Sequence, residues 1–492
     1  MSQNNYAQAS WHDLFSGRNA ALALVLSGGV ALHAINIYLS TTILPTVVAD
    51  IGGREFYAWN TTLFVVASII GAALSSKLLH GFGARTAYLS AAALLFAGSL
   101  IAALSPNIGQ MLLGRTVQGL GGGIMVSLGY GVVALVFEER LWQRAFALVS
   151  GMWGVATLFG PAIGGIFAEL GIWRFAFGVM LPVIIVYAIA VVKLLPQTQT
   201  TEDADRLALP QLVLLSGAIM AIATASIFAD LTLNALALLM ACGLIALLIR
   251  VEHRASIRLL PRAALIPSSR LFATFATMAL LLFGTSSGVF MPYFLQHLHG
   301  QTPLIAGYLA ALTAVGWTAA ELLSARYHGR RADRAIRLGP CFSVTGLIGL
   351  VFLVPLGSSG LSPTLVLICG SLILVGFGIG FCWPHLATLV FKLTADEDHH
   401  LASSSMTSIT MFASAFGASV AGMIANLTGF SRAESSLMLA DSAFWLQSLF
   451  ALIVSFTLFS AAAVVRQSDH RPSASPQPQP QPQPQQEREV AR

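Results

Sequence analysis

Charged residues are scarce in this chain of 492 residues, because Asp, Glu, Lys and Arg together make up only 10%. A soluble domain normally carries roughly a quarter charged residues. Hydrophobic residues make up 56%, and the mean hydropathy is +0.77. This composition excludes an ordinary soluble protein and predicts an all-α membrane protein that crosses the bilayer many times.

Cysteine is also sparse. The four cysteines are Cys242, Cys341, Cys369 and Cys382, and none forms a Cys-x-x-Cys pair. Neither a zinc site nor a disulfide framework is therefore predicted. The chain also lacks the His/Glu spacing of a metal site and the Gly-Lys-Ser/Thr of a phosphate-binding loop. We predict no cofactor, and both an enzyme and an ATP-driven pump are disfavoured.

About fourteen apolar segments are long enough to cross a bilayer, which requires ~20 residues each. They are 21–45, 57–79, 87–105, 108–137, 145–169, 173–195, 209–228, 231–249, 271–296, 303–325, 338–357, 362–392, 401–427 and 443–466. Only Ala229 and Asp230 separate the seventh from the eighth. If those two segments form one re-entrant pair, the count falls to about twelve.

Arginines are distributed unevenly between the loops, which sets the orientation. With the N-terminus in the cytoplasm, the outer loops hold only Arg54, Arg174 and Arg432. The inner loops then hold Arg85, Arg140, Arg144, Arg250, Arg254, Arg258, Arg262, Arg270, Arg326, Arg330, Arg331, Arg334 and Arg337. Both termini are thus predicted to be cytoplasmic. The net charge of +5 follows from this asymmetry, and nucleic acid is not expected as a partner.

The segments group into two halves. A weak repeat supports this division, since Ser76 precedes His80-Gly81 by the same spacing with which Ser324 precedes His328-Gly329. Internal repeats of this kind are common in secondary transporters. The predicted parts are a cytoplasmic N-terminus (1–20), a six-helix half (21–195), two extra helices with flanking loops (196–270), a second six-helix half (271–466) and a disordered Pro/Gln-rich tail (467–492).

Arg115 stands alone in an apolar segment, with no charged residue within twenty positions on either side. An arginine in hydrocarbon is costly, so it must face a polar interior or a partner. Gln118 lies on the same helix face, and the glycines from Gly119 onward allow another helix to approach closely. Arg115 is either a structural residue bonded to backbone carbonyls or part of a transport path.

A second motif, Gly160-Pro161-x-x-Gly164-Gly165, lies in the fifth segment. Proline removes a helical hydrogen bond and bends the chain, and the glycines permit close helix contact. The motif is either a structural kink or a hinge.

Leu113-x-Arg115-x-x-Gln118-Gly119 resembles the fourth-helix motif of major facilitator transporters, and the Gly160–Gly165 motif resembles their antiporter motif, which marks exporters. From about Ala21 to Arg466 the chain is similar to the drug:proton antiporters with fourteen spans. The resemblance implies the major facilitator fold, with two six-helix halves and two extra central helices.

The same resemblance implies the function. We expect a monomeric secondary active exporter in the cytoplasmic (inner) membrane, surrounded by lipid. It would move small amphiphilic molecules out of the cytoplasm in exchange for protons by alternating access. The alternatives are an exporter of one endogenous metabolite, siderophore or lipid, with the same fold, and a channel, for which no filter motif is evident.

The chain departs from the family at two positions where an aspartate is usual, Asn36 and His80. Residues for proton coupling must therefore be sought elsewhere, and the candidates are Arg115, Glu321 and His33. Glu321 is the only carboxylate well inside an apolar run, where it could bind a proton near neutral pH. Alternatively Glu321 pairs with Arg326 at the surface, and His33 only bonds a neighbouring helix.

The substrate cavity is the least defined prediction. Polar and aromatic side chains from several segments could supply its walls, although aromatic residues in membrane helices often only pack. The candidates are Asn36, Gln118, Trp153, Tyr293 and Trp317.

Overall fold

The computed structural model describes residues 10–195, 207–398 and 401–469. Within these ranges the chain is helical, with no β-strand. Most of the predicted tail, the first nine residues and much of the loop between the halves lie outside the described residues.

The first half contains α2 to α8. Their bounds are α2 (Gly17–Ile51), α3 (Trp59–Ala103), α4 (Ile108–Gly131), α5 (Val133–Val136), α6 (Glu139–Glu169), α7 (Arg174–Gly178) and α8 (Met180–Leu194). We call these helices the N-terminal bundle. The short η1 (Arg54–Phe56) connects α2 to α3.

The second half contains α11 to α17, the C-terminal bundle. Its helices are α11 (Arg270–Thr285), α12 (Met291–His297), α13 (Pro303–Ser324), α14 (Arg330–Leu353), α15 (Pro363–Leu393), α16 (Leu401–Leu427) and α17 (Ser436–Asp469). Short turns of 3₁₀ helix lie before and between them: η2 (Arg262–Leu265), η3 (Ser286–Phe290), η4 (Val354–Leu356), η5 (Asp396–Asp398) and η6 (Phe430–Arg432).

All fourteen predicted segments coincide with helix. Among the described residues, 12 helices are long and apolar enough to span a membrane, with α3 counted once. α3 contains two predicted segments, which meet at Gly83, where φ is 79°; glycine adopts this left-handed conformation without a steric penalty. α4 is not among the 12, because glycines and polar residues lower its hydropathy, but it is a helix of 24 residues packed along α3.

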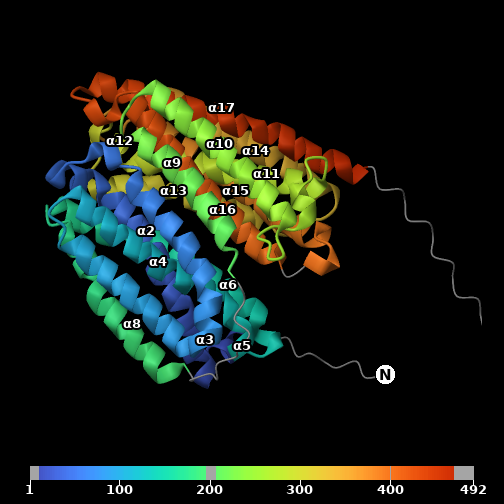
Figure 1. The fold of residues 1–492 in the computed structure, drawn as a ribbon. Coiled ribbons are helices and arrows are strands. Elements are labelled where there is room, and N and C mark those ends of the chain that lie inside the picture. The colour runs from blue at the N-terminus through green and yellow to red at the C-terminus, as the bar shows by residue number, and fades with distance from the viewer. Residues whose placement is uncertain (1–9, 196–206, 399–400, 470–492) are drawn as a thin grey trace, which may run out of the picture.

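The two bundles lie close together near α12 and separate toward the opposite end (Figure 1). The described chain begins at that opposite end, and α17 finishes there (Figure 1). We call these the α12 end and the terminal end. The first and the last described residues therefore lie on the side where the bundles diverge, as expected for an even number of crossings between them.

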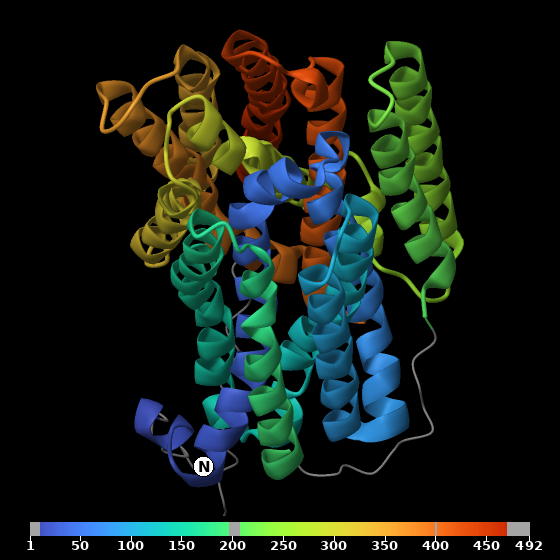
Figure 2. The same cartoon turned by 90° about the vertical axis from the view of Figure 1, so that its left-hand side faces the viewer.

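The seventh and eighth predicted segments form two separate antiparallel helices, α9 (Leu209–Ser226) and α10 (Leu231–Arg254). This hairpin stands beside the bundles (Figure 2). The Trp59 indole N–H donates to the Ala223 carbonyl at 3.0 Å, and the Asn426 amide donates to the Ser226 carbonyl at 3.0 Å. α9 is thus bonded to both bundles near the α12 end.

The hairpin is also fixed to the C-terminal bundle at the terminal end. Arg258 follows α10, and its two terminal nitrogens donate to the Asp398 carboxylate at 2.8 and 3.2 Å. The Arg262 backbone N–H donates to the same carboxylate at 3.0 Å. Although burial alone raises the pKa of Asp398, these hydrogen bonds and the arginine charges outweigh it and lower that pKa below its usual value of 3.8.

An apolar cavity of about 370 Å³ separates α10 from the C-terminal bundle. It lies near the middle of the helices, and every residue in its wall is hydrophobic. The lining residues are Leu238, Ala279, Leu280, Phe283, Phe412, Ala413, Phe416, Val420, Met423, Leu449 and Ile453.

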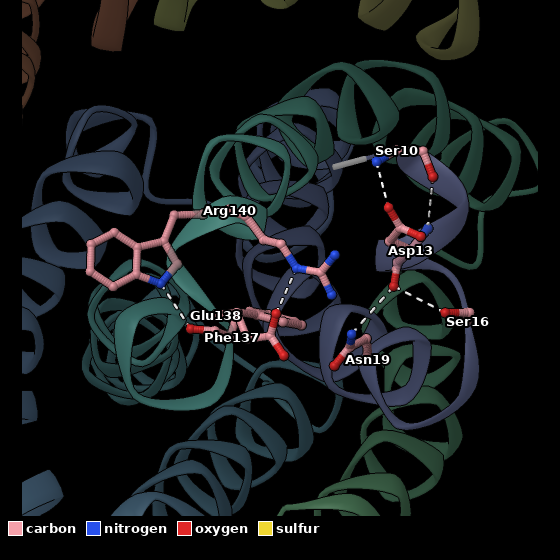
Figure 3. A network of polar contacts seen from close by, with 8 residues as sticks. Ser10, Asp13, Ser16, Asn19, Phe137, Glu138 and Arg140 are labelled. Carbon is pink, nitrogen blue, oxygen red and sulfur yellow. Dashed lines mark hydrogen bonds and ion pairs between the residues drawn. The ribbon is translucent and has the colours of Figure 1, made fainter. Parts of the chain in front are cut away.

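The short α1 (Trp11–Leu14) packs where α2 and α6 begin (Figure 3). Ser10 and Asp13 form a capping box, in which the Ser10 N–H donates to the Asp13 carboxylate at 2.6 Å. This bond is the main reason why the pKa of Asp13 is below its usual value. Asn19 of α2 donates to the Asp13 carbonyl at 3.3 Å, and Arg140 pairs with Glu138 at 2.6 Å on α6.

Candidate functional site

Arg115 lies in the interior of the N-terminal bundle, where only 1% of its surface is exposed. Its Nη1 donates to Asn36 Oδ1 on α2 and, at 2.7 Å, to Gln118 Oε1 on α4. Its Nε donates weakly to the Asn60 carbonyl at 3.4 Å, and its Cζ lies 4.1 Å from the centre of the Phe64 ring. We call these five residues the Arg115 cluster.

The Arg115 cluster contains no carboxylate. Every acceptor of the guanidinium is a neutral oxygen from a side-chain amide or the backbone. Among the described residues, Arg115 takes part in no ion pair. The bundle therefore holds a buried positive charge that neutral dipoles and one aromatic ring stabilise.

His33 and Trp153 lie next to this cluster. The His33 ring stacks on Phe64 with centroids 5.1 Å apart, and the Trp153 ring meets it edge-on at 6.0 Å. His33 is 3% exposed, and its Nδ1 has no hydrogen-bond partner. The structure thus brings together His33, Asn36, Arg115, Gln118 and Trp153, which the sequence placed on three different segments.

The glycines of α4 make this proximity possible. A Cβ on Gly119 or Gly123 would overlap the backbone of α3, and a Cβ on Gly122 would overlap His33 Nδ1. Larger residues at these positions would push α4 away from α2 and α3, so the glycines hold Arg115 within reach of Asn36.

The Gly160-Pro161 motif lies where α6 meets α2 and α13. A Cβ on Gly164 would come within 2.7 Å of the Leu39 carbonyl oxygen on α2, and a Cβ on Gly165 would overlap Leu304 on α13. A Cβ on Gly307 of α13 would come within 2.6 Å of the Thr42 side chain on α2 and within 3.2 Å of Pro161 Cβ. Two helices from opposite bundles therefore meet almost backbone to backbone. We call this the glycine contact.

Further contacts join the bundles at the α12 end. The Glu169 carboxylate accepts from the Leu304 N–H at 3.2 Å, and Arg54 donates to the Ala433 carbonyl at 3.0 Å. An aromatic cluster packs between the two bundles, with its Tyr57 and Phe290 rings stacked at 4.9 Å. The cluster contains Tyr57, Phe290, Tyr293 and Phe430.

Tyr293, a predicted wall residue of the substrate cavity, belongs to this aromatic cluster. Only 3% of its surface is exposed, and its ring stacks on His297 at 4.0 Å. In this arrangement the side chain contributes to the contact between the bundles.

Glu321 and Trp317 form a separate site on α13. The Trp317 indole N–H donates to the Glu321 carboxylate at 3.1 Å, and the Trp317 ring lies 5.2 Å from that of Trp383. Glu321 is half-buried, and among the described residues it forms no ion pair with Arg326. The structure thus separates Glu321 from Arg115 and His33, which lie in the other bundle.

Several buried polar residues, at these sites and in the α9–α10 hairpin, were not among the sequence predictions. Asn60 contacts Arg115 through its carbonyl, and Ser99 accepts from the Gln118 amide at 3.0 Å. Glu252 on α10 is only 1% exposed; it accepts from the backbone N–H groups of Leu259 and Leu260. Each is a polar residue in or beside an apolar segment, and that was the available signal.

Comparison with known proteins identifies the family. The Major Facilitator Superfamily model matches residues 26–396 and 274–490. A probable multidrug-efflux transporter of Mycobacterium tuberculosis is 34% identical over 489 residues, which cover 97% of this chain and 100% of that relative. The multidrug efflux pump SdrM of Staphylococcus aureus is 27% identical over 382 residues, covering 76% of this chain and 82% of the pump.

Solved structures share the fold. A peptide transporter in complex with sulfate superposes with a TM-score of 0.67 at 14% identity, covering 93% of this chain and 97% of the transporter. A D-xylose-proton symporter gives a TM-score of 0.61 at 12% identity, covering 90% and 97%. Since the family model and a near full-length relative agree with the all-α architecture, the chain belongs to the Major Facilitator Superfamily and is a multi-pass membrane transporter, not an enzyme.

Proposed function

We propose that this chain is a secondary active exporter that moves small amphiphilic molecules out of the cytoplasm in exchange for protons. Two relatives carry names that describe multidrug efflux, and one of them spans nearly the whole chain. The predicted orientation places the terminal end, where the bundles diverge, in the cytoplasm.

The observation that carries the proposal is the glycine contact. Alternating access requires two rigid bodies that meet at one end and can exchange that contact for one at the other end. Gly164 and Gly165, which have no side chains of their own, let α6 approach the backbones of α2 and α13 closely. Because the glycines have no side chains, the two helices can separate at this contact without rearranging side chains there. The same lack of side chains lets the bundles close tightly.

Proton coupling is assigned to Glu321, with His33 as the alternative carrier. A carboxylate that is half-buried and bonded to an indole N–H can alternate between a hydrated, ionised state and a packed, protonated state. Arg115 contributes a fixed charge in the opposite bundle.

Transport by the purified protein in proteoliposomes tests this proposal. A panel of cationic, neutral and anionic amphiphiles would be measured with and without an imposed pH gradient. We expect uphill movement of some compounds that a protonophore abolishes. Equal transport rates with and without the imposed pH gradient would refute proton coupling. If no amphiphile is transported but cells expressing the protein secrete an altered set of metabolites, the specific metabolite exporter replaces the multidrug exporter.

A further inference from the structure

The Arg115 cluster is rich in donors and poor in acceptors. Arginine carries five N–H groups. Nε and Nη1 of Arg115 have acceptors, whereas Nη2 has none among the described residues. The Asn36 amide nitrogen is buried, and it too has no hydrogen-bond partner. Two hydrogen-bonded residues therefore each keep one nitrogen, Arg115 Nη2 and Asn36 Nδ2, that has no acceptor among the described residues, and Asn36 Nδ2 is fully buried.

The charge of the site is equally unbalanced. Removing one partner of a buried ion pair is strongly destabilising, because the remaining charge is left without compensation. Arg115 is in that situation permanently, since its protein partners are neutral. A site with a positive charge and free donors is suited to a ligand that brings both a negative charge and lone pairs.

We infer that Arg115 and Asn36 form an anion-binding subsite, and that its ligand is a carboxylate carried by the transported molecule. Arg115 Nη2 can donate a charge-assisted hydrogen bond to a carboxylate, and Asn36 Nδ2 supplies a further donor to the same group. This inference rests on the proposed export function and names the class of substrate, which is an anionic or zwitterionic amphiphile. A free halide is the other source of the same charge.

The surroundings fit a small anionic head with an apolar body. Phe64 packs against the guanidinium of Arg115, the His33 ring packs against Phe64, and the Trp153 ring packs against His33. Trp153 is 37% exposed, so its ring gives the cluster an accessible aromatic border. An aromatic carboxylate could place its charge on Arg115 and its ring against these side chains.

Binding to the purified full-length protein in detergent tests the inference without requiring transport. The probes are sodium benzoate, sodium chloride and uncharged benzamide in a low-salt zwitterionic buffer, and the readout is the melting temperature. A ligand that binds only the folded protein raises this temperature with the logarithm of its concentration. We expect benzoate to do so and benzamide not to.

Variants connect the effect to the cluster. Asn36→Asp places a carboxylate against Arg115, so it should raise the melting temperature without ligand and weaken benzoate binding at least roughly tenfold. Arg115→Gln removes the charge and should abolish the benzoate shift, which keeps the test valid if Asn36→Asp does not fold. Arg140→Gln, at an exposed arginine of α6, is the matched control and should leave the benzoate shift unchanged.

The outcomes separate the possibilities. A benzoate shift that exceeds the chloride shift supports a substrate carboxylate, and equal shifts support the anion site with a free halide as its ligand. A benzoate shift that persists in both Asn36→Asp and Arg115→Gln, or that benzamide reproduces, overturns the inference. Proton-driven export without benzoate binding would leave the proposed function intact and overturn the inference. Benzoate binding without any export would refute the proposed function and the assignment of the carboxylate to a transported molecule, and it would leave the anion site.

Discussion

Gly165 of α6 lies closer to Leu304 of α13 than any side chain at that glycine would permit. These two residues belong to opposite bundles, so one added methyl group tests whether the contact between the bundles controls transport. Gly165→Ala forces the backbones apart, and overpacking of this kind costs typically 1–3 kcal/mol. We expect the population of the conformation closed at the α12 end to fall roughly tenfold or more. The rate of export in proteoliposomes should fall by a similar factor.

Gly154 provides the matched control for this substitution, because it lies on the same helix and a Cβ there would meet no atom within 4 Å. Gly154→Ala should export normally. Equal export by the Gly165→Ala and Gly154→Ala variants would remove the glycine contact from the mechanism.

Arg115 should be required for transport both for its charge and for its shape. Arg115→Ala leaves Asn36 Oδ1 and Gln118 Oε1 without their donor, and we expect no transport although the protein reaches the membrane. Arg115→Lys should recover little, since an ammonium group lacks both the separate Nε donor to the Asn60 carbonyl and the planar guanidinium over the Phe64 ring. Transport and membrane abundance would be measured together, and normal transport by Arg115→Ala would leave the residue with a structural role alone.

Glu321 should be needed to couple export to proton movement, and it should not be needed to bind the substrate. Glu321→Gln mimics the protonated carboxyl and keeps an oxygen that can accept from the Trp317 indole. Gradient-driven export should be lost, whereas substrate exchange without a gradient should survive. Arg326→Gln tests the competing surface pair and should have little effect. If Glu321→Gln exports normally along a pH gradient, another group carries the proton or export is not proton-coupled.

The Asp398–Arg258 pair should stabilise the protein in a defined pH range. Because the folded-state pKa of Asp398 lies below its usual value of 3.8, its stabilisation is fully present above that value and is lost as the pH falls further. Asp398→Asn should lower the stability by roughly 1–3 kcal/mol at neutral pH, and the difference should shrink below about pH 4. Thermal melting in detergent at several pH values measures it.

The exposed Arg140–Glu138 pair is the control for this experiment. Glu138→Gln should change stability by less than about 0.5 kcal/mol, because exposed ion pairs contribute little. A pH-independent effect of Asp398→Asn would mean that the carboxylate charge is not responsible.

The predicted orientation can be tested by labelling single cysteines introduced at Arg331 and Arg432. The positive-inside rule predicts a cytoplasmic label at the first and an external label at the second. External labelling at the first site would reverse the assignment of the terminal end, and with it the direction in which the bundles open.

Hydropathy was sufficient to predict the helices, because a bilayer requires long apolar segments with internally satisfied backbones. It was insufficient near their ends. The eighth segment was predicted to end at 249, whereas α10 continues to Arg254 and buries Glu252. Hydropathy falls where charged residues begin, even if the helix and its packing continue.

The site was predictable only in part. Arg115 was evident because an isolated charge in an apolar helix needs a partner, but the sequence did not say that its partners are Asn36 and the Asn60 carbonyl. The aromatic residues were less informative, since a ring packs equally well against a substrate or another helix. Tyr293 was predicted in a cavity wall, and in this arrangement it packs in the aromatic cluster; its role as a wall residue stays a prediction.

The apolar cavity between α10 and the C-terminal bundle has a practical consequence. Its hydrophobic wall offers water no hydrogen bond, so the cavity is better suited to bind hydrocarbon than water. We expect a fatty-acyl tail to occupy this cavity in the bilayer and a detergent tail to occupy it after solubilisation. Among detergents with the same headgroup, the half-life of the folded, purified transporter should therefore depend on whether the alkyl chain is long enough to reach Phe283 and Phe416 from the surface.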